Sequence, residues 1–150
     1  MTRRLRGDDG QVGGMEVLPF GFLVFVSGTL LILNVWGIID AKFAVTSASR
    51  EATRAYVEAS DAVAAEVAAL ERATETLTAY GRDGDRATVS TPVLDAPFGR
   101  CVRVAITVSY DVPILAIPWI GGFGRLGAVE STASEVVDPF RSGLDGPARC

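Results

Sequence analysis

The chain of 150 residues contains no histidine. This absence excludes histidine-based catalytic triads, histidine-ligated metal sites and the most common general base. The sequence also has no phosphate-binding loop, no dinucleotide-binding fingerprint and no Gly-x-Ser-x-Gly elbow. Asp83 and Asp85 lie close together, but the further ligands of a calcium loop are missing, so we interpret them as turn residues. We therefore expect no enzyme activity, no cofactor, no metal site and no small-molecule substrate.

Charge of one sign is nowhere concentrated in this chain. Its 14 basic and 18 acidic residues give a net charge of −4, and both signs are interspersed along residues 50–86, as on a solvated helix face. Because there is no basic patch, we expect no nucleic-acid partner.

The sequence does contain one long apolar run, residues 17–39, interrupted only by Asn34 and by small residues. As a helix this run is about 34 Å long, and the hydrocarbon core of a bilayer is about 30 Å thick. A cleaved secretory signal is the alternative, but its apolar core spans only about 7 to 15 residues before a small-x-small cleavage site, which is poor here. We predict a retained transmembrane helix with membrane lipid as a partner.

Charge counting does not decide the orientation of this span, because three basic residues precede it and three follow it. They are Arg3, Arg4, Arg6, Lys42, Arg50 and Arg54. The tight leading cluster and the short leading segment favour a cytoplasmic N-terminus. We predict a single-pass protein of the cell membrane, with residues 1–16 as a cytoplasmic leader and residues 40–150 on the extracytoplasmic side.

Residues 40–80 contain neither proline nor glycine and are rich in alanine, which predicts a long extracytoplasmic amphipathic helix. Its apolar side chains recur at helical spacing along one stripe. The stripe comprises Val45, Ala52, Tyr56, Val63, Val67, Leu70 and Leu77. Because nothing breaks the helical pattern where the apolar span ends, the sequence predicts a single rod from the bilayer to the end of this segment.

The pattern changes after the predicted helix, and residues 81–138 are expected to form an antiparallel β region that starts with a turn. Strict alternation of apolar and polar residues over 102–112 predicts the main strand, with partners at 88–94 and 126–137. Residues 139–150 form a C-terminal tail. The predicted fold class is α+β, with about three antiparallel strands packed on the outer half of the long helix.

Residues 113–124, between the last two predicted strands, are too apolar for an ordinary solvated connection. One interpretation is that Leu115, Ile117 and Trp119 fold back onto the helix. The other is a contact with a partner or with the membrane interface, for which Ile117, Trp119 and Phe123 are the candidate residues.

Cys101 and Cys150 are the only two cysteines, and we predict that they form a disulfide. The alternative is two free thiols. A bond between them would tie the C-terminal tail, which is rich in glycine and proline, to the start of the main strand.

Asn34 is a polar side chain within the apolar span, where an amide favours a hydrogen-bond partner over lipid. It either bonds to a neighbouring helix, which makes it a candidate assembly residue, or is a tolerated polar residue near the outer interface. Gly21, Gly28 and Gly37 are not spaced four residues apart, so the small-xxx-small dimer motif is missing.

Several segments in this order resemble a known family. They are Arg6-Gly-Asp-Asp-Gly-Gln-Val-Gly-Gly-Met-Glu16, the adjoining apolar span, Ser49-Arg-Glu-Ala-Thr-Arg-Ala-Tyr56, the main strand, the Pro-Trp-Ile-Gly-Gly loop and Glu135-Val-Val-Asp-Pro-Phe-Arg141. Over nearly its whole length the chain resembles the TadE-like proteins, which are minor pilin-like components (pseudopilins) of tight-adherence pilus systems, in particular the actinobacterial members. The resemblance implies contacts with other pilin-like subunits and with inner-membrane pilus platform proteins.

In pilin-like proteins a processing peptidase cuts after a glycine just before the apolar helix and leaves a glutamate five residues into the mature chain. Glu16 occupies that place, so the resemblance implies that it meets the N-terminal amine of a neighbouring subunit. A cut with this spacing follows Gln11, whereas a cut after Gly10 makes Glu16 the sixth residue. The alternative is a carboxylate that is simply solvated at the cytoplasmic interface beside Arg6.

The resulting prediction is a membrane-anchored minor pilin-like structural component of a tight-adherence pilus or related secretion apparatus, which packs through its hydrophobic N-terminal helix. The alternative is a monomeric single-pass membrane-anchored binding or accessory module.

Overall fold

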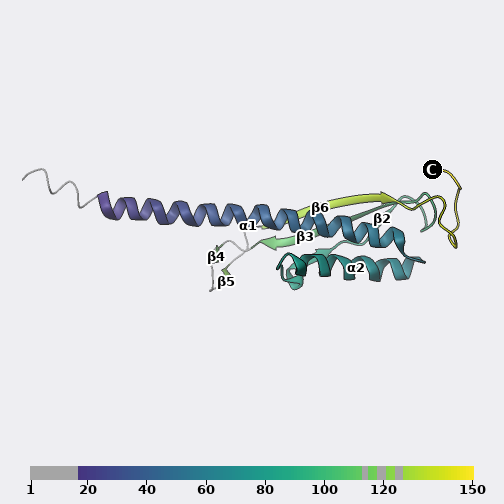
Figure 1. Ribbon diagram of the computed structural model, residues 1–150, viewed down its shortest axis with the longest axis horizontal. Helices are drawn as coiled ribbons and strands as arrows, with labels where there is room; N and C mark the ends of the chain where they lie inside the picture. Colours follow the sequence, from purple (N-terminus) through teal and green to yellow (C-terminus); the bar gives the residue numbers. More distant parts are fainter. Residues whose placement is uncertain (1–16, 113–114, 118–120, 124–126) are drawn as a thin grey trace, which may run out of the picture.

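The computed structural model describes residues 17–112, 115–117, 121–123 and 127–150. A long helix runs out of a small domain in which a helical hairpin covers one face of an antiparallel sheet (Figure 1). The elements in chain order are α1 (Val17–Glu58), α2 (Ala62–Ala79), the 3-10 turn η2 (Gly84–Arg86), β1 (Ala87–Val89), β2 (Val93–Leu94), β3 (Arg103–Val112), β4 (Leu115–Ile117), β5 (Gly121–Phe123) and β6 (Gly127–Val136). The predicted α+β class is confirmed.

Helix α1 has 42 residues and is therefore about 63 Å long. Its apolar first half projects from the domain with its side chains exposed, and its second half lies in the core (Figure 1). The helix passes from one half to the other without a break, as predicted from the unbroken pattern at Asp40.

The prediction of one helix through residue 80 is wrong, because α1 ends at Glu58 and α2 runs back beside it. Asp61 is the N-cap of α2, and its Oδ1 accepts a hydrogen bond from the Ala64 N–H at 2.9 Å. The Ser60 hydroxyl donates to the second Asp61 oxygen at 2.9 Å. Short polar side chains favour such caps over a helix interior, so this pair ends the rod without proline or glycine.

The break also changes which side chains of the second helix are buried. Val63, Val67 and Leu70, which belong to the predicted apolar stripe, are 76%, 53% and 55% exposed. The buried positions of α2 are Ala65, Ala69, Ala73 and Leu77. A helix that turns back presents a new face to its neighbour, and alanines on that face allow the two backbones to approach closely.

The sheet is built around β3. Strand β6 pairs antiparallel with one edge of β3 over ten residues, from Arg103↔Val136 to Val112↔Gly127, while β1 and β2 share the other edge. The predicted partner strand at 88–94 is therefore split in two. At the split, the Ser90 hydroxyl accepts the Thr107 N–H at 3.0 Å, and the Ser90 N–H donates to the Thr107 carbonyl at 2.8 Å.

The core lies between the helical hairpin and one face of the sheet. Every second residue of the main strand is buried, as the alternation predicted, and the intervening residues of β3 are half-buried or exposed. The buried residues are Val102, Val104, Ile106, Val108, Tyr110 and Val112. Buried Thr53 and Ser49 on α1 are not left unpaired, because the Thr53 hydroxyl donates to the Ser49 carbonyl at 2.7 Å and the Ser49 hydroxyl to Ser131 at 3.3 Å.

Close packing of the two helices gives a first prediction. Ala73→Leu adds volume at a fully buried position, so we expect the free energy of unfolding to fall by about 1–3 kcal/mol in urea titrations of the detergent-solubilised protein. The matched control is Ala79→Leu at an exposed position of the same helix, with an expected change within about 0.5 kcal/mol. Equal effects of the two substitutions would contradict the tight helix contact.

Candidate functional site

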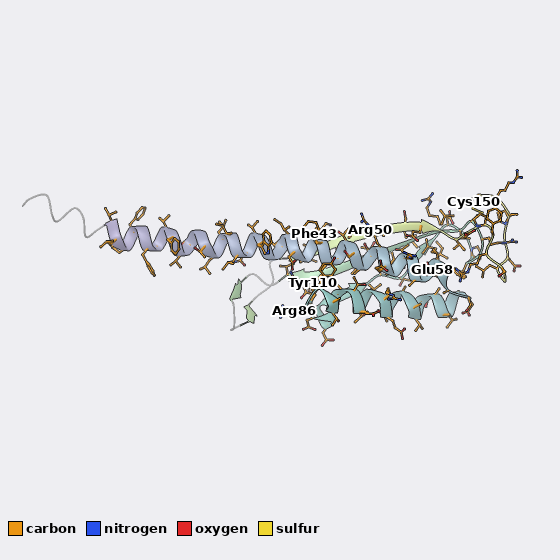
Figure 2. The ribbon with its side chains drawn as sticks, in the orientation of Figure 1. Phe43, Arg50, Glu58, Arg86, Tyr110 and Cys150 are labelled. Atoms are coloured by element: carbon orange, nitrogen blue, oxygen red, sulfur yellow. A yellow bond between two sulfur atoms is a disulfide. The ribbon has the colours of Figure 1, made fainter. Side chains whose placement is uncertain are left out.

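The boundary at which α1 leaves the domain is the candidate site. Within about one and a half helical turns, α1 changes from Ile39, which is 45% exposed, to Ala41 and Ala44, which are fully buried. Among the described residues, α1 is the one helix that is long and apolar enough to cross a membrane, and none of its most apolar stretch is buried. Figure 2 shows the side chains that surround this exposed stretch and Phe43, labelled at the start of the domain.

Arg82 joins the end of the helical hairpin to α1 at this boundary. Its guanidinium forms an ion pair with Asp40 and donates to the Gly37 carbonyl at 3.4 Å. It also lies over the ring of Tyr110, 5.7 Å from the ring centroid, in cation–π geometry. Helix α1, the turn after α2 and strand β3 therefore meet at the side chain of Arg82, although the sequence predicts only a turn at this residue.

Two further polar contacts fix the domain close to the same boundary. The Lys42 ammonium donates to the Glu130 carbonyl and so ties α1 to β6. The hydroxyls of Ser47 and Tyr80 lie 3.1 Å apart and join α1 to the end of α2. Near the boundary, α1 is thus attached both to the sheet and to the end of α2.

Asn34 lies in the span on a partly covered face of α1. Its Nδ2 donates to the Leu30 carbonyl one turn earlier at 2.7 Å, so one amide hydrogen already has a partner within the helix. Thr29 bonds back to Phe25 in the same way, at 2.9 Å. A contact of Asn34 with a neighbouring helix stays a prediction.

Four other predicted site residues lie outside the described part of the chain. They are the assembly residue Glu16 and the processing residues Gly10 and Gln11, which precede α1, and the partner-loop residue Trp119, which falls between β4 and β5 in the sequence.

Within the predicted partner loop, Ile117 ends β4 opposite Gly121, and Phe123 ends β5 opposite Leu115. The backbone of β4 approaches α1. The two interpretations of the loop side chains, packing on the helix and contact with a partner or the membrane interface, both stay predictions.

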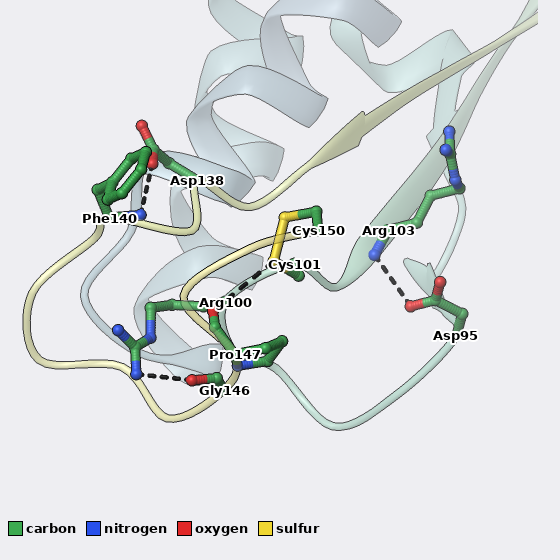
Figure 3. Close-up of a disulfide and its surroundings, with 9 residues drawn as sticks. All are labelled: Asp95, Arg100, Cys101, Arg103, Asp138, Phe140, Gly146, Pro147 and Cys150. Carbon is green, nitrogen blue, oxygen red and sulfur yellow. Dashed lines mark hydrogen bonds between the residues drawn. A yellow bond between two sulfur atoms is a disulfide. The ribbon is translucent and has the colours of Figure 1, made fainter.

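The end of the domain far from the span is closed by the predicted disulfide between Cys101 and Cys150, with Cα atoms 5.2 Å apart (Figure 3). The tail that precedes Cys150 packs directly on the backbone around Arg100. A Cβ atom on Gly99 would lie 2.6 Å from the Asp145 carbonyl oxygen, and one on Gly146 would lie 2.7 Å from that of Arg100. Only glycine fits these two positions without a shift of the backbone.

The same tail caps α1. Arg141 donates from Nη1 to the Val57 carbonyl at 2.7 Å and from Nη2 to the Glu58 carbonyl. These carbonyls have no intrahelical partner at a helix end, and a cation there also complements the helix dipole. The disulfide thus restricts the segment that carries Arg141, which stabilises the end of α1. The position of Arg141 in the sequence does not indicate this role.

Local structure explains the shifted pKa values of two ionisable groups, Asp61 and Tyr56. The N–H of Ala64 and the hydroxyl of Ser60 hold the pKa of Asp61 below its usual range, and burial raises the pKa of Tyr56. Because the pKa of Asp61 is lowered by folding, its contribution to stability is present above its unfolded pKa and is lost as the pH falls through the folded value. No cluster of three metal-ligating side chains occurs among the described residues.

Comparisons of the chain with protein-family models, with curated proteins and with solved structures find no match.

The contacts of Arg82 give the second prediction. Arg82→Gln removes the ion pair with Asp40 and the cation over Tyr110, so we expect the free energy of unfolding to fall by about 1.5 kcal/mol, near the lower end for hydrogen bonds to charged groups because Asp40 is about half exposed. The control is Arg72→Gln, which removes an exposed ion pair with Glu75 and should cost less than about 0.5 kcal/mol. An Arg82 effect as small as that of the control would contradict its role at the boundary.

The disulfide gives the third prediction. Replacement of Cys101 and Cys150 together by serine should lower the free energy of unfolding by about 4 kcal/mol, because the bond closes a long loop in the unfolded chain. Reduction of the native protein with a small thiol should produce the same loss and serves as the control. Two thiols that titrate in the denatured, non-reduced protein would refute the bond.

Proposed function

We propose that this chain is a membrane-anchored minor pilin-like structural component of a tight-adherence pilus or related secretion apparatus. One observation carries the proposal: a single unbroken helix is both the exposed apolar span and the core of the folded domain. A tethered binding module needs only a flexible linker between anchor and domain, whereas a subunit that assembles through its anchor needs the two to move together.

The rigidity of this connection has a physical basis in the contacts described above. Near the boundary, Arg82 joins the turn after α2 to α1, and Lys42 joins α1 to β6. Arg141 caps the far end of the helix. A displacement of the span along its axis is therefore transmitted to the sheet. That property suits a subunit that is extracted from, or held in, a membrane by its neighbours.

The proposed orientation has the N-terminus in the cytoplasm and the domain outside. The disulfide supports this assignment, because such bonds persist in oxidising compartments and are rare in the cytosol. The short cluster of arginines before the span supports the same membrane orientation.

The resemblance to TadE-like proteins supports the choice of partners. It implies that the span packs with the spans of other pilin-like subunits and contacts inner-membrane platform proteins, while lipid surrounds the remainder. The exposed surface of α1 between Val17 and Ile39 offers the apolar area for such packing.

The monomeric membrane-anchored accessory module has one observation in its favour. One amide hydrogen of Asn34 has a partner within its own helix, so that hydrogen does not require a second helix. Cross-linking in native membranes, followed by identification of the partners, distinguishes the two functions. Products with pilin-like or platform proteins favour the structural component, and products with neither favour the module.

The fourth prediction concerns Glu16. A carboxylate at the start of an apolar helix is costly unless it is solvated or paired with a cation. If it pairs with the N-terminal amine of a neighbouring subunit, Glu16→Gln removes a charged hydrogen bond worth about 1.5–3 kcal/mol. We expect a loss of cross-linking to pilin partners of at least about tenfold, with expression and membrane insertion unchanged.

Glu71→Gln is the control, because Glu71 is an exposed glutamate of the outer domain, far from the start of the span. It should leave cross-linking and piliation at the native level. Unchanged piliation and unchanged cross-linking in Glu16→Gln would return Glu16 to the role of a solvated residue at the start of the helix.

A further inference from the structure

The antiparallel hairpin formed by β4 and β5 lies at the end of the domain that faces the span (Figure 1). We propose that this hairpin is a second membrane contact, which lies among the headgroups and the adjoining acyl chains of the outer leaflet. The proposal rests on α1 as a membrane anchor and does not depend on the pilus.

The backbone places the hairpin beside the span. Strand β3 ends at Val112 and β6 begins at Gly127, and both residues line a small, mostly apolar groove of about 130 Å³ together with Ile38 of α1. The chain between these two strand ends therefore leaves the sheet next to the outer end of the apolar stretch. Figure 1 places β4 and β5 beyond the end of β3, alongside the exposed half of α1, and the backbone of β4 approaches α1.

The composition of the hairpin fits lipid better than water. No charged residue occurs in the sequence between Asp111 and Arg125. Strand β4 is Leu-Ala-Ile, strand β5 is Gly-Gly-Phe, and Trp119 lies between them in the sequence. Tryptophan and phenylalanine supply apolar area, and tryptophan in particular is enriched where a protein crosses the membrane interface.

The depth of the contact follows from hydrogen bonding. A ribbon of two strands has N–H and C=O groups along both outer edges, and the hydrocarbon core offers them no partners. Water and headgroups at the interface do offer partners. On α1, about 20 residues cross the hydrocarbon core, which places Trp36 near its outer boundary when the core begins at Val17.

Such a contact restricts the faces of the span that are free for other proteins. Asn34, Gly37 and Ile38 are partly covered positions of α1, whereas Trp36 is 69% exposed. Anchored by α1 and by the hairpin, the domain cannot rotate freely about the helix axis. Neighbouring spans would then pack against the side of α1 that the hairpin leaves open.

The two tryptophans of the chain allow a direct test on the full-length protein. Trp36→Phe leaves Trp119, which lies between β4 and β5 in the sequence, as one reporter, and Trp119→Phe leaves Trp36 of the span as the other. Each variant is reconstituted into phosphatidylcholine–phosphatidylglycerol vesicles that contain lipids brominated either close to the headgroup or close to the bilayer centre. We expect blue-shifted emission from Trp119, with quenching by the shallow bromines at least about twofold stronger than by the deep ones.

A further substitution tests whether the hairpin itself makes the contact. Ile117→Asp, in the Trp36→Phe background, places a charge at the end of β4 and should remove most of the shallow quenching of Trp119, while the protein still floats with the vesicles through α1.

Quenching of Trp36 but not of Trp119 would overturn the proposal. Red-shifted Trp119 emission would then mean that the hairpin lies in water, and blue-shifted emission would mean that protein covers it. If neither tryptophan is quenched, the anchor fails as well, which distinguishes this result from a failure of the pilus role alone.

Discussion

The continuity of α1 across its change of environment is the constraint on which the rest of the structure depends. Its backbone hydrogen bonds are formed within the helix in either environment, so the same helix is stable where its side chains are exposed and where they pack in the domain core. The change from Ile39 to Ala41 separates these two uses. Helix α2 and the sheet built on β3 pack on the second half of that helix, where apolar bulk gives way to alanine.

Small side chains make this arrangement compact. Alanines on α1 and α2 bring the two backbones together, while the larger residues of the core come from β3 and from positions such as Leu77 and Tyr56. Hydroxyl groups inside the core are paired with helix carbonyls or with β6, so their burial leaves no unsatisfied donor. Because many core residues are alanine, we expect the polar contacts at the two ends of the domain to carry a larger share of its stability.

The polar contacts at the two ends of the domain are made by arginines that lie far in the sequence from the residues they contact. Arg82 attaches the turn after α2 to the membrane end of the domain, and Arg141 attaches the tail to the other end of α1. The disulfide keeps Arg141 near its target by restricting the tail. In the proposed structural role, these contacts make the span and the sheet one mechanical unit, and the proposed membrane contact of the β4–β5 hairpin would orient that unit.

The sequence by itself determined the features that depend on local periodicity and composition. The apolar span, the alternation that buries one face of β3 and the turn after the second helix followed from residue order, and the two cysteines permitted a single intramolecular disulfide. The tertiary structure decided the rest. Asp61 ends one helix and starts another only because α2 gains a face on α1 by turning back, which exposes Val63. Arg82 and Arg141 acquire their roles through contacts that join distant segments, and no local pattern encodes the distance between groups that meet only after the chain has folded.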